Sequence, residues 1–160
     1  MVEKGARAIV AEAEPEEVQA VARLVQTVVC RDAGAPVVPP PPPPAAGLVL
    51  EARRDGRLVG GLLLDREGDG ARVSWWAVER PERLTGVGRA LLERAEGWCE
   101  SQGLSPLAVR AITSVPSAAR LLWACGFRVV SFDAVDLGGR SIELLWFEKA
   151  APRGAASRAG

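Results

Sequence analysis

The pattern of apolar and polar residues predicts a chain that starts with a strand and continues into a helix. Residues 6–14 form a short segment suited to a strand, and Pro15 then marks the start of a helix. Proline suits the first helical turn because the N–H group that it lacks has no partner there. Apolar side chains follow at helical spacing, at Val18, Val21, Ala22, Val25 and Val28.

A proline-rich segment, residues 36–46, comes after this helix. Its six consecutive prolines, Pro39 to Pro44, favour an extended polyproline II conformation, about 19 Å long at about 3.1 Å per residue. We interpret the segment as a spacer or loop. The alternative is a ligand for an SH3-like groove, but the flanking residues are apolar and lack the positive charge that usually orients such ligands.

Three antiparallel strands are predicted in residues 47–79. Asp55 and Gly56 separate the first strand from the second, and this dipeptide tolerates the positive φ angles of a tight hairpin turn. Residues 66–70 then turn the chain into a third strand. Successive hairpins place these strands side by side in one sheet.

The third strand, residues 71–79, is apolar on both sides. Regular alternation of side chains puts Val73, Trp75 and Ala77 on one face. The other face then carries Trp76 and Val78. We expect this strand in the middle of a sheet that is covered on both faces.

Two helices and three strands are expected in the second half of the chain. A helix lies between the strand of residues 71–79 and the next strand, so these two strands are predicted to be parallel. The expected elements are a helix from Gly86 to about Ser101, a strand at residues 106–112, a short helix at residues 117–127 that ends at Gly126, and a closing hairpin of residues 127–137 and 141–149.

Together these elements predict a single domain of the α/β (α+β) class. Its sheet is mixed and mostly antiparallel, with about seven strands, and helices cover both faces. The domain is expected to span residues 1–150, with the proline-rich loop at residues 36–46. The small and polar tail, residues 151–160, is predicted to be disordered. The closing hairpin can pair with another copy, which makes a homodimer possible.

The charge balance favours a small partner. The 160 residues contain 20 basic and 20 acidic side chains, so the formal net charge is zero, and no run of Lys or Arg occurs. A nucleic-acid binder or a protein of anionic membrane surfaces usually shows a basic patch. No segment approaches the roughly 18 uninterrupted apolar residues of a membrane span. We expect neither nucleic acid nor membrane as a partner.

Residue types that are missing narrow the chemistry. The chain has no histidine and no tyrosine, so mechanisms that use an imidazole or a phenol are excluded. Its three cysteines, Cys30, Cys99 and Cys125, are odd in number and lack CxxC spacing. This argues against a disulfide framework and against a zinc site, and no metal is expected. A reducing, cytoplasmic location is predicted.

The segment from Arg83 to Gly88 carries the clearest chemical signal. It lies between a central strand and a helix, where free backbone N–H groups at the helix N-terminus attract an anion. Glycine at positions 86 and 88 removes side chains that would keep a phosphate from these groups. A Rossmann fingerprint would need a third glycine where Leu91 stands, and the Gly-Lys-Ser/Thr of a P-loop is absent. The alternative is a helix start whose glycines only allow close packing.

In this context the segment resembles the signature of the GCN5-related N-acetyltransferase (GNAT) superfamily. That signature reads Arg/Gln-x-x-Gly-x-Gly/Ala and is met by Arg83, Gly86 and Gly88. The resemblance extends over residues 7–149 and includes the order of elements. A second family signature is matched on the following helix by Ala118, Leu121, Leu122, Gly126 and Phe127.

The resemblance implies that acetyl-CoA is the cosubstrate. It would lie where the strand that ends at Val78 splays from the strand of residues 107–111. Main-chain groups of that first strand would pair with the pantetheine arm, and the amides at the helix start would hold the pyrophosphate. The implied CoA-binding residues are Trp76, Ala77, Val78, Arg83, Leu84, Thr85, Gly86, Val87, Gly88, Arg89 and Ser117.

Two catalytic positions of the family are not matched in this chain. Many relatives protonate the leaving thiolate with a tyrosine, and the matching position here is Leu122. Some relatives, notably those that acetylate protein N-termini, carry a glutamate on the preceding strand, where this chain has Ala108. Both expected groups are therefore missing from this chain.

Weak substitutes for the missing acid and base are present. Ser114 and Ser117 can donate to the thiolate or hold a water, although capping of the short helix is the favoured interpretation. Cys125 can act as an acid but is more typical of a core residue, and Glu79 can act as a base. One of the two central tryptophans, Trp75 or Trp76, can line the acceptor site.

The sequence therefore predicts an acyl-CoA-dependent N-acyltransferase. The expected reaction moves an acetyl group from acetyl-CoA to an amine of a small molecule or peptide by direct attack. One alternative is a catalytically silent CoA-binding module. Another is an interaction protein that is organised by its proline tract.

Overall fold

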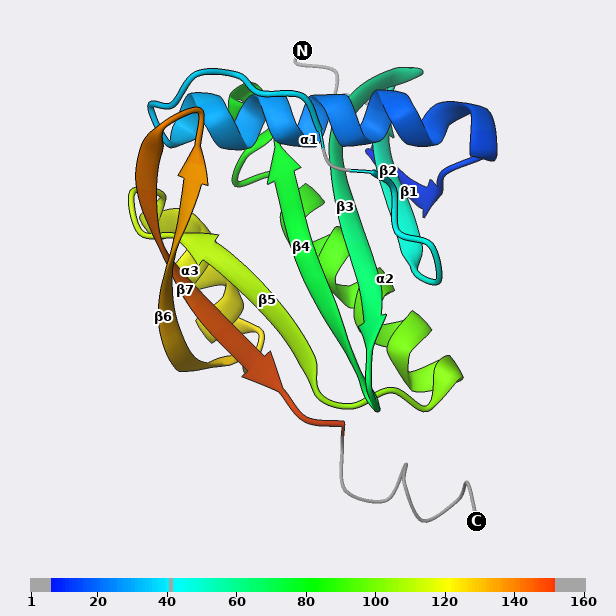
Figure 1. Cartoon of the computed structure of the whole chain (residues 1–160). Coiled ribbons are helices and arrows are strands. Elements are labelled where there is room, and N and C mark those ends of the chain that lie inside the picture. Colours follow the sequence, from blue (N-terminus) through cyan, green and yellow to red (C-terminus); the bar gives the residue numbers. More distant parts are fainter. Residues whose placement is uncertain (1–6, 41, 152–160) are drawn as a thin grey trace.

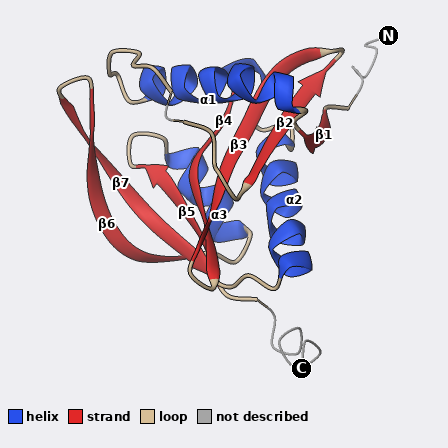
Figure 2. Cartoon of the chain, turned by 45° about the vertical axis from the view of Figure 1, so that its right-hand side comes forward, coloured by secondary structure: helices blue, strands red, loops and turns tan. Residues whose placement is uncertain are grey.

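The computed structural model describes residues 7–40 and 42–151, and within them a sheet of seven strands is covered by helices on both faces (Figures 1 and 2). Helix α1 crosses one face, and α2 and α3 lie on the other. The elements are β1 (Ile9–Glu12), α1 (Val18–Asp32), β2 (Leu48–Arg54), β3 (Arg57–Glu67), β4 (Gly70–Val78), α2 (Val87–Gln102), β5 (Leu107–Ile112), α3 (Pro116–Ala124), β6 (Arg128–Leu137) and β7 (Arg140–Lys149), with 3-10 turns at Pro15–Glu17 and Arg80–Glu82.

The sheet has the strand order β1-β2-β3-β4-β5-β7-β6. Neighbouring strands are antiparallel except β4 and β5, which are parallel. The predicted mixed, mostly antiparallel sheet and the predicted parallel pair are thus confirmed. The parallel pairing joins residues 71–73 of β4 to residues 107–109 of β5. Beyond these residues the two strands diverge, as Figure 1 shows.

A β-bulge in β4 changes the faces predicted for this strand. Leu63 of β3 pairs with Trp75, but Leu64 pairs with Val73, so Ser74 is an extra residue. Val73 therefore packs in the core under α2, whereas Trp75 and Ala77 pack under α1. The prediction that Val73 shares a face with these two residues was wrong, because alternation fails across a bulge. Both faces of the strand are apolar, as predicted.

Each face of the sheet has its own apolar core. The core between the sheet and α1 includes Val21 and Val25, both fully buried. The core on the opposite face includes Leu91 and Leu92 of α2 and Leu122 of α3, which are also fully buried. Burial of a side chain of this size stabilises the fold by about 1.5–3 kcal/mol. Residues of β4 belong to both cores, so this strand is covered on both faces.

The segment between α1 and β2 packs against the turn of the last hairpin. Gly34 O accepts a hydrogen bond of 3.0 Å from Arg140. A Cβ atom on Gly138 would lie 3.2 Å from Pro36. The described part of the proline tract belongs to no helix or strand, as expected of a loop. Residue 41 and most of the predicted tail, residues 152–160, lie outside the described residues.

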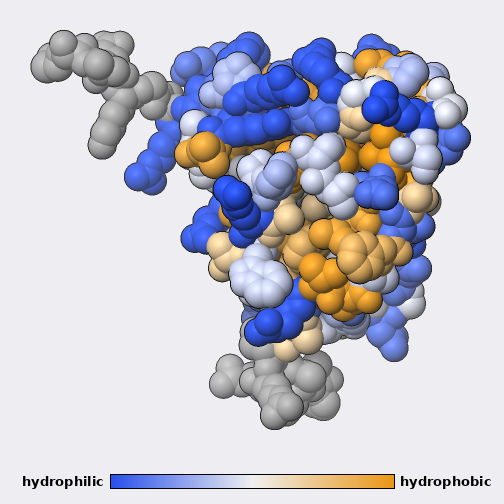
Figure 3. Space-filling view, turned by 90° about the vertical axis from the view of Figure 1, so that its left-hand side faces the viewer, coloured by the Kyte–Doolittle hydropathy of each residue, from blue (hydrophilic) through white to orange (hydrophobic). Residues whose placement is uncertain are grey.

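Strand β6 is an edge of the sheet with exposed apolar side chains. Phe132 is 81% exposed and Val130 is 53% exposed. Figure 3 shows apolar residues gathered on this side of the molecule. An apolar edge strand can pair with another chain, so a homodimer through the closing hairpin remains a prediction.

Candidate active site

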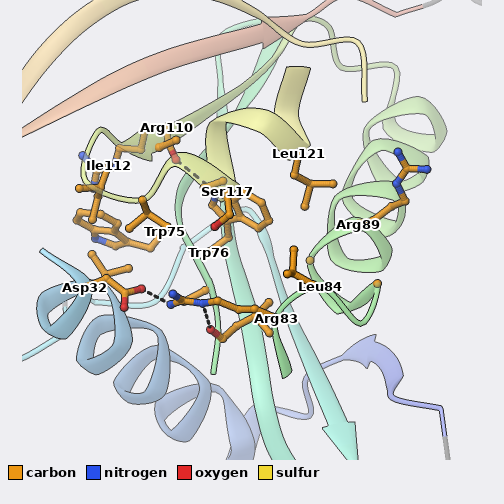
Figure 4. A pocket seen from close by; sticks show the side chains of 18 residues that line it. Asp32, Trp75, Trp76, Arg83, Leu84, Arg89, Arg110, Ile112, Ser117 and Leu121 are labelled. Atoms are coloured by element: carbon orange, nitrogen blue, oxygen red, sulfur yellow. Dashed lines mark hydrogen bonds and ion pairs between the residues drawn. The ribbon is translucent and has the colours of Figure 1, made fainter. Parts of the chain in front are cut away.

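A cavity of about 260 Å³ lies where β4 and β5 diverge, and we call it the cleft. Side chains from α1, β4, α2, β5 and α3 line it, together with the loop between β4 and α2. Figure 4 shows Leu84 and Arg89 at one end and Trp75, Arg110 and Ile112 at the other. The predicted CoA-binding residues that line the cleft are Trp76, Ala77, Val78, Arg83, Leu84, Gly86, Gly88, Arg89 and Ser117.

The N-terminus of α2 presents free backbone N–H groups to the cleft. The helical ladder begins with the bond from Ala90 N to Gly86 O, 3.0 Å long. The amides of residues 87–89 precede this bond, and no side chain of the described chain caps the helix. Unpaired amides and the helix dipole together favour an anion at this end of the cleft.

Two left-handed residues shape the loop that precedes α2. Leu84 has φ +65° and Gly86 has φ +92°. For a residue with a side chain, this conformation costs about 1–2 kcal/mol. Leu84 is nevertheless 97% exposed, so apolar burial does not compensate the strain. Left-handed residues within a turn aim successive N–H groups into one concavity, which is how backbone nests bind anions.

The two glycines are required for different reasons. A Cβ atom on Gly88 would lie 3.1 Å from Leu121 Cδ2 and 3.2 Å from Trp76 Cζ3, so glycine allows α2 to approach β4 and α3 closely. A Cβ atom on Gly86 would meet no heavy atom within 4 Å. Gly86 is needed for its positive φ angle. Close packing, the alternative considered above, therefore applies to Gly88.

Arg83 holds the loop rather than facing the helix N-terminus. Its Nε donates a hydrogen bond of 3.1 Å to Val78 O, and its guanidinium forms an ion pair with Asp32 at the end of α1. The Asp32 side chain is only 9% exposed and also lies 3.5 Å from Arg80. These contacts tie the loop to α1. Sequence reasoning missed Asp32, which lies 51 residues before Arg83.

A second ion pair anchors the same loop to the β2–β3 hairpin. Glu82 is 8% exposed, and its carboxylate accepts a hydrogen bond of 2.7 Å from Arg54. Arg57 lies 3.4 Å from the other carboxylate oxygen. Thr85, a predicted CoA-binding residue, donates its hydroxyl to Glu82 O. Val87, another of the predicted residues, is buried in the core. Thr85 and Val87 present only their backbones to an anion.

Arg110 lies on β5 and crosses the point where β4 and β5 separate. Its Nε donates to Ser74 O, and its guanidinium carbon lies 3.7 Å from the ring centroid of Trp75. On the other face, Trp76 Nε1 donates a bond of 3.3 Å to Arg110 O. Burial and, to a smaller extent, the positive charge of Arg72 lower the pKa of Arg110 to about 10, while the negative charge of Asp133 acts in the opposite direction. Sequence reasoning missed this residue, although a charged arginine within an otherwise apolar strand could have marked it as a candidate functional residue.

The weak catalytic candidates are separated by the fold. Ser117 lines the cleft, but Ser114 does not, and its Oγ lies 3.4 Å from Asp32 O. Neither serine caps α3, so the capping interpretation was wrong: the helix starts at Pro116 with Val115 as its N-cap. Pro116 at the first position leaves Ser117 inside the helix. Glu79 is not part of the cleft wall.

Three other positions named from the sequence lie outside the cleft. Leu122 is fully buried in the core, while its neighbour Leu121 lines the cleft. Ala108 lines a second cavity of about 600 Å³ beside β6. Cys125 packs at the edge of the core, and its carbonyl accepts a bond of 2.8 Å from Lys149. No acid or base of the usual family type therefore enters the cleft from these positions.

None of the helices within residues 7–40 and 42–151 is long and apolar enough to cross a membrane. In the same part of the chain, no three metal-binding side chains cluster.

Comparison with known proteins identifies the family. The model of the acetyltransferase (GNAT) family matches residues 39–127, which is more than half of the chain. Among curated proteins, none matches the sequence.

Three solved structures with a similar fold are distant from this chain in sequence. The ribosomal-protein-S18-alanine N-acetyltransferase of Escherichia coli has a TM-score of 0.68 at 15% identity, over 92% of this chain and 98% of its own. An N-acetyltransferase of Staphylococcus aureus Mu50 has a TM-score of 0.70 at 13% identity, over 91% and 99%. A Bacillus anthracis structure in complex with acetyl coenzyme A has a TM-score of 0.58 at 17% identity, over 67% and 64%. These likenesses show the fold, and the family match, which includes the loop and glycines at the start of α2, shows that this chain belongs to the acetyltransferase (GNAT) family.

Proposed function

We propose that this chain transfers an acetyl group from acetyl-CoA to an amine of a small molecule or peptide by direct attack. The observation that carries the proposal is the continuity of the cleft. Free amides at the start of α2 open into it, and it continues past Trp76 to the opposite face of the sheet at Arg110. A long donor can bind at one end of such a cleft while an amine enters at the other.

Binding of acetyl-CoA would use main-chain groups more than side chains. The pyrophosphate would lie against the amides from Leu84 to Arg89, and the exposed Arg89 side chain is close enough to the cleft to add a positive charge. The edge of β4 that faces β5 has no described strand partner after Val73. An extended pantetheine arm can pair with this free edge at Trp76, Ala77 and Val78 as an added strand. A bound acetyl coenzyme A in a Bacillus anthracis structure of the same fold supports this donor.

The reaction needs two proton transfers besides the acyl transfer. The amine nitrogen attacks the thioester carbon, the carbon–sulfur bond breaks, the nitrogen loses a proton, and the thiolate gains one. Ser117 is the candidate donor to the thiolate because it lines the cleft. Glu79 and Ser114 lie outside the cleft and would have to act through water. Holding the amine beside the thioester supplies much of the acceleration.

A catalytically silent CoA-binding module is the second candidate. It is favoured by the burial of Leu122 and by the place of Ala108 outside the cleft. Such a module would bind acetyl-CoA at the same amides but release no thiol. The third candidate is an interaction protein organised by its proline tract. It predicts that deletion of Pro39 to Pro44 alters binding of a partner and leaves acetyl-CoA binding unchanged.

Titration calorimetry and a free-thiol assay test the proposal together. We expect saturable acetyl-CoA binding with a Kd on the order of 1 µM to 1 mM, and a Gly86→Val variant should bind at least about tenfold more weakly because valine resists a positive φ angle. Thiol release is then measured over amines, aminoglycosides, amino acids and peptides. Absence of acetyl-CoA binding would refute the proposal, and binding without thiol release for any acceptor would leave the silent module.

A further inference from the structure

Arg110 provides a positive charge at the end of the cleft that lies away from the α2 amides. Its side chain lies on the α1 face of the sheet, stacked on Trp75, while α2 and α3 lie on the other face. Figure 4 shows Arg110, Trp75 and Ile112 on one side of the cleft and Leu84 and Arg89 on the other. A donor held by the α2 amides would reach Arg110 with its thioester end. Arg110 would then lie at the end of the cleft that remains for the acceptor.

No acidic side chain balances this charge within the cleft. Among the described residues, no carboxylate lies within the 4.0 Å limit of an ion pair with Arg110. Asp32 is the one acid of the described cleft wall, and Arg83 and Arg80 already neutralise it. Asp133 on β6 acts on Arg110 only from a greater distance. The acceptor end of the cleft thus carries an excess positive charge.

The guanidinium is fixed in place but keeps free donors. Its Nε bonds to Ser74 O, and the Trp75 ring fixes its plane. A guanidinium has five N–H donors, and the four on its two terminal nitrogens have no hydrogen-bond partner among the described residues. A planar pair of such nitrogens matches the two oxygens of a carboxylate. Arg110 is half-buried, and a partly desolvated cation without an adjacent anion is unfavourable, so a carboxylate from a ligand would relieve this.

We propose, resting on the acetyltransferase function proposed above, that Arg110 binds the carboxylate of the acceptor and that the acceptor is an α-amino acid or a similarly small amino carboxylate. On the α1 face, where Arg110 stacks on Trp75, the cleft is also lined by Ile112 and Val29, so an apolar side chain on this amino acid is favoured. The carboxylate anchored on Arg110 would place the neighbouring amine beside the thioester. With a depressed pKa of about 10, Arg110 still carries its charge at neutral pH.

Acceptors that differ only in the carboxylate test the inference. A screen of the common α-amino acids first finds the best side chain, with acetyl-CoA as donor. The amino acid, its amide and the amine without a carboxyl group are then compared; for phenylalanine these are L-phenylalanine, L-phenylalaninamide and phenethylamine. We expect the carboxylate acceptor to have the lowest KM. Arg110→Gln should raise that KM about 10–100-fold, as for the loss of a charged hydrogen-bonded pair, and leave the KM of the amide and the Kd of acetyl-CoA unchanged.

Matched variants separate recognition from folding. Arg72 is the neighbouring arginine on β4, which lies over Trp146 and lines the second cavity. Arg72→Gln should leave the KM of every acceptor unchanged. Arg110→Lys keeps the positive charge and should raise the KM of the carboxylate acceptor less than Arg110→Gln does. Equal KM values for acid and amide, or a KM for the acid that Arg110→Gln does not change, would overturn the inference.

A second arm identifies the source of the carboxylate. Succinyl-CoA with phenethylamine places the carboxylate on the acyl group, and a dependence on Arg110 in this arm alone would overturn the assignment to the acceptor. Amino-acid binding to the protein is also followed by tryptophan fluorescence, without turnover. If acetyl-CoA fails to bind, the proposed function fails, while amino-acid binding that requires Arg110 still supports the carboxylate site.

Discussion

Gly88 allows a quantitative test of how tightly α2 packs on the cleft. In Gly88→Ala the added methyl carbon would lie 3.1 Å from Leu121 and 3.2 Å from Trp76, closer than the optimum of about 3.5–4.0 Å. Overpacking of this kind costs about 1–3 kcal/mol. Alanine regains at most about 1 kcal/mol of helix propensity, and less in the first turn. We expect a net loss of about 1–2 kcal/mol.

Gly97 in the same helix is the matched control for Gly88. A Cβ atom on Gly97 would meet no heavy atom within 4 Å, and the residue lies well inside α2. Gly97→Ala should therefore stabilise the fold by about 1 kcal/mol. At about 2–4 °C per kcal/mol for a chain of this size, Tm should rise by about 2–4 °C in this control and fall by about 2–8 °C in Gly88→Ala.

Thermal unfolding and acetyl-CoA titration are measured on both variants. Leu121 and Trp76 line the cleft, so their displacement in Gly88→Ala should also weaken acetyl-CoA binding, while Gly97→Ala should bind as the wild type does. A Gly88→Ala variant that unfolds at or above the Tm of Gly97→Ala would refute the reasoning, because it would mean that the helix is not held against Trp76.

Two further predictions concern the reaction and the loop. Because the chain has no histidine, kcat/KM should rise with pH up to the pKa of the acceptor amine, without a step near about 6.5; a step there that persists with acceptors of different pKa would contradict this. Arg83→Met removes the cation that pairs with the buried Asp32 and should lower the free energy of unfolding by about 1–3 kcal/mol. A double-mutant cycle with Asp32→Asn, measured by urea unfolding, should show coupling between the two residues. Additive effects would exclude the pair as the anchor of the loop.

Local features of the site were the most predictable. Gly86 lies between an apolar strand and an amphipathic helix, so the free amides at the start of that helix depend only on the few residues around it, whereas the positive φ angle of Gly86 came from the structure. The bulge at Ser74 was not predictable, because an extra residue in a strand leaves no mark on the pattern of apolar positions. Its consequence is large, since it moves Val73 and Trp75 to opposite faces.

The sequence by itself determined the order of strands and helices, the free amides at the start of α2 and the absence of imidazole and phenol groups. These follow from short-range periodicity and from residue identity. Only the tertiary structure decided which distant residues meet. It paired Arg83 with Asp32 and placed Arg110 against Trp75 without an acidic partner among the described residues. Such contacts depend on how α1 and β5 pack on the sheet, and no spacing along the chain records that packing.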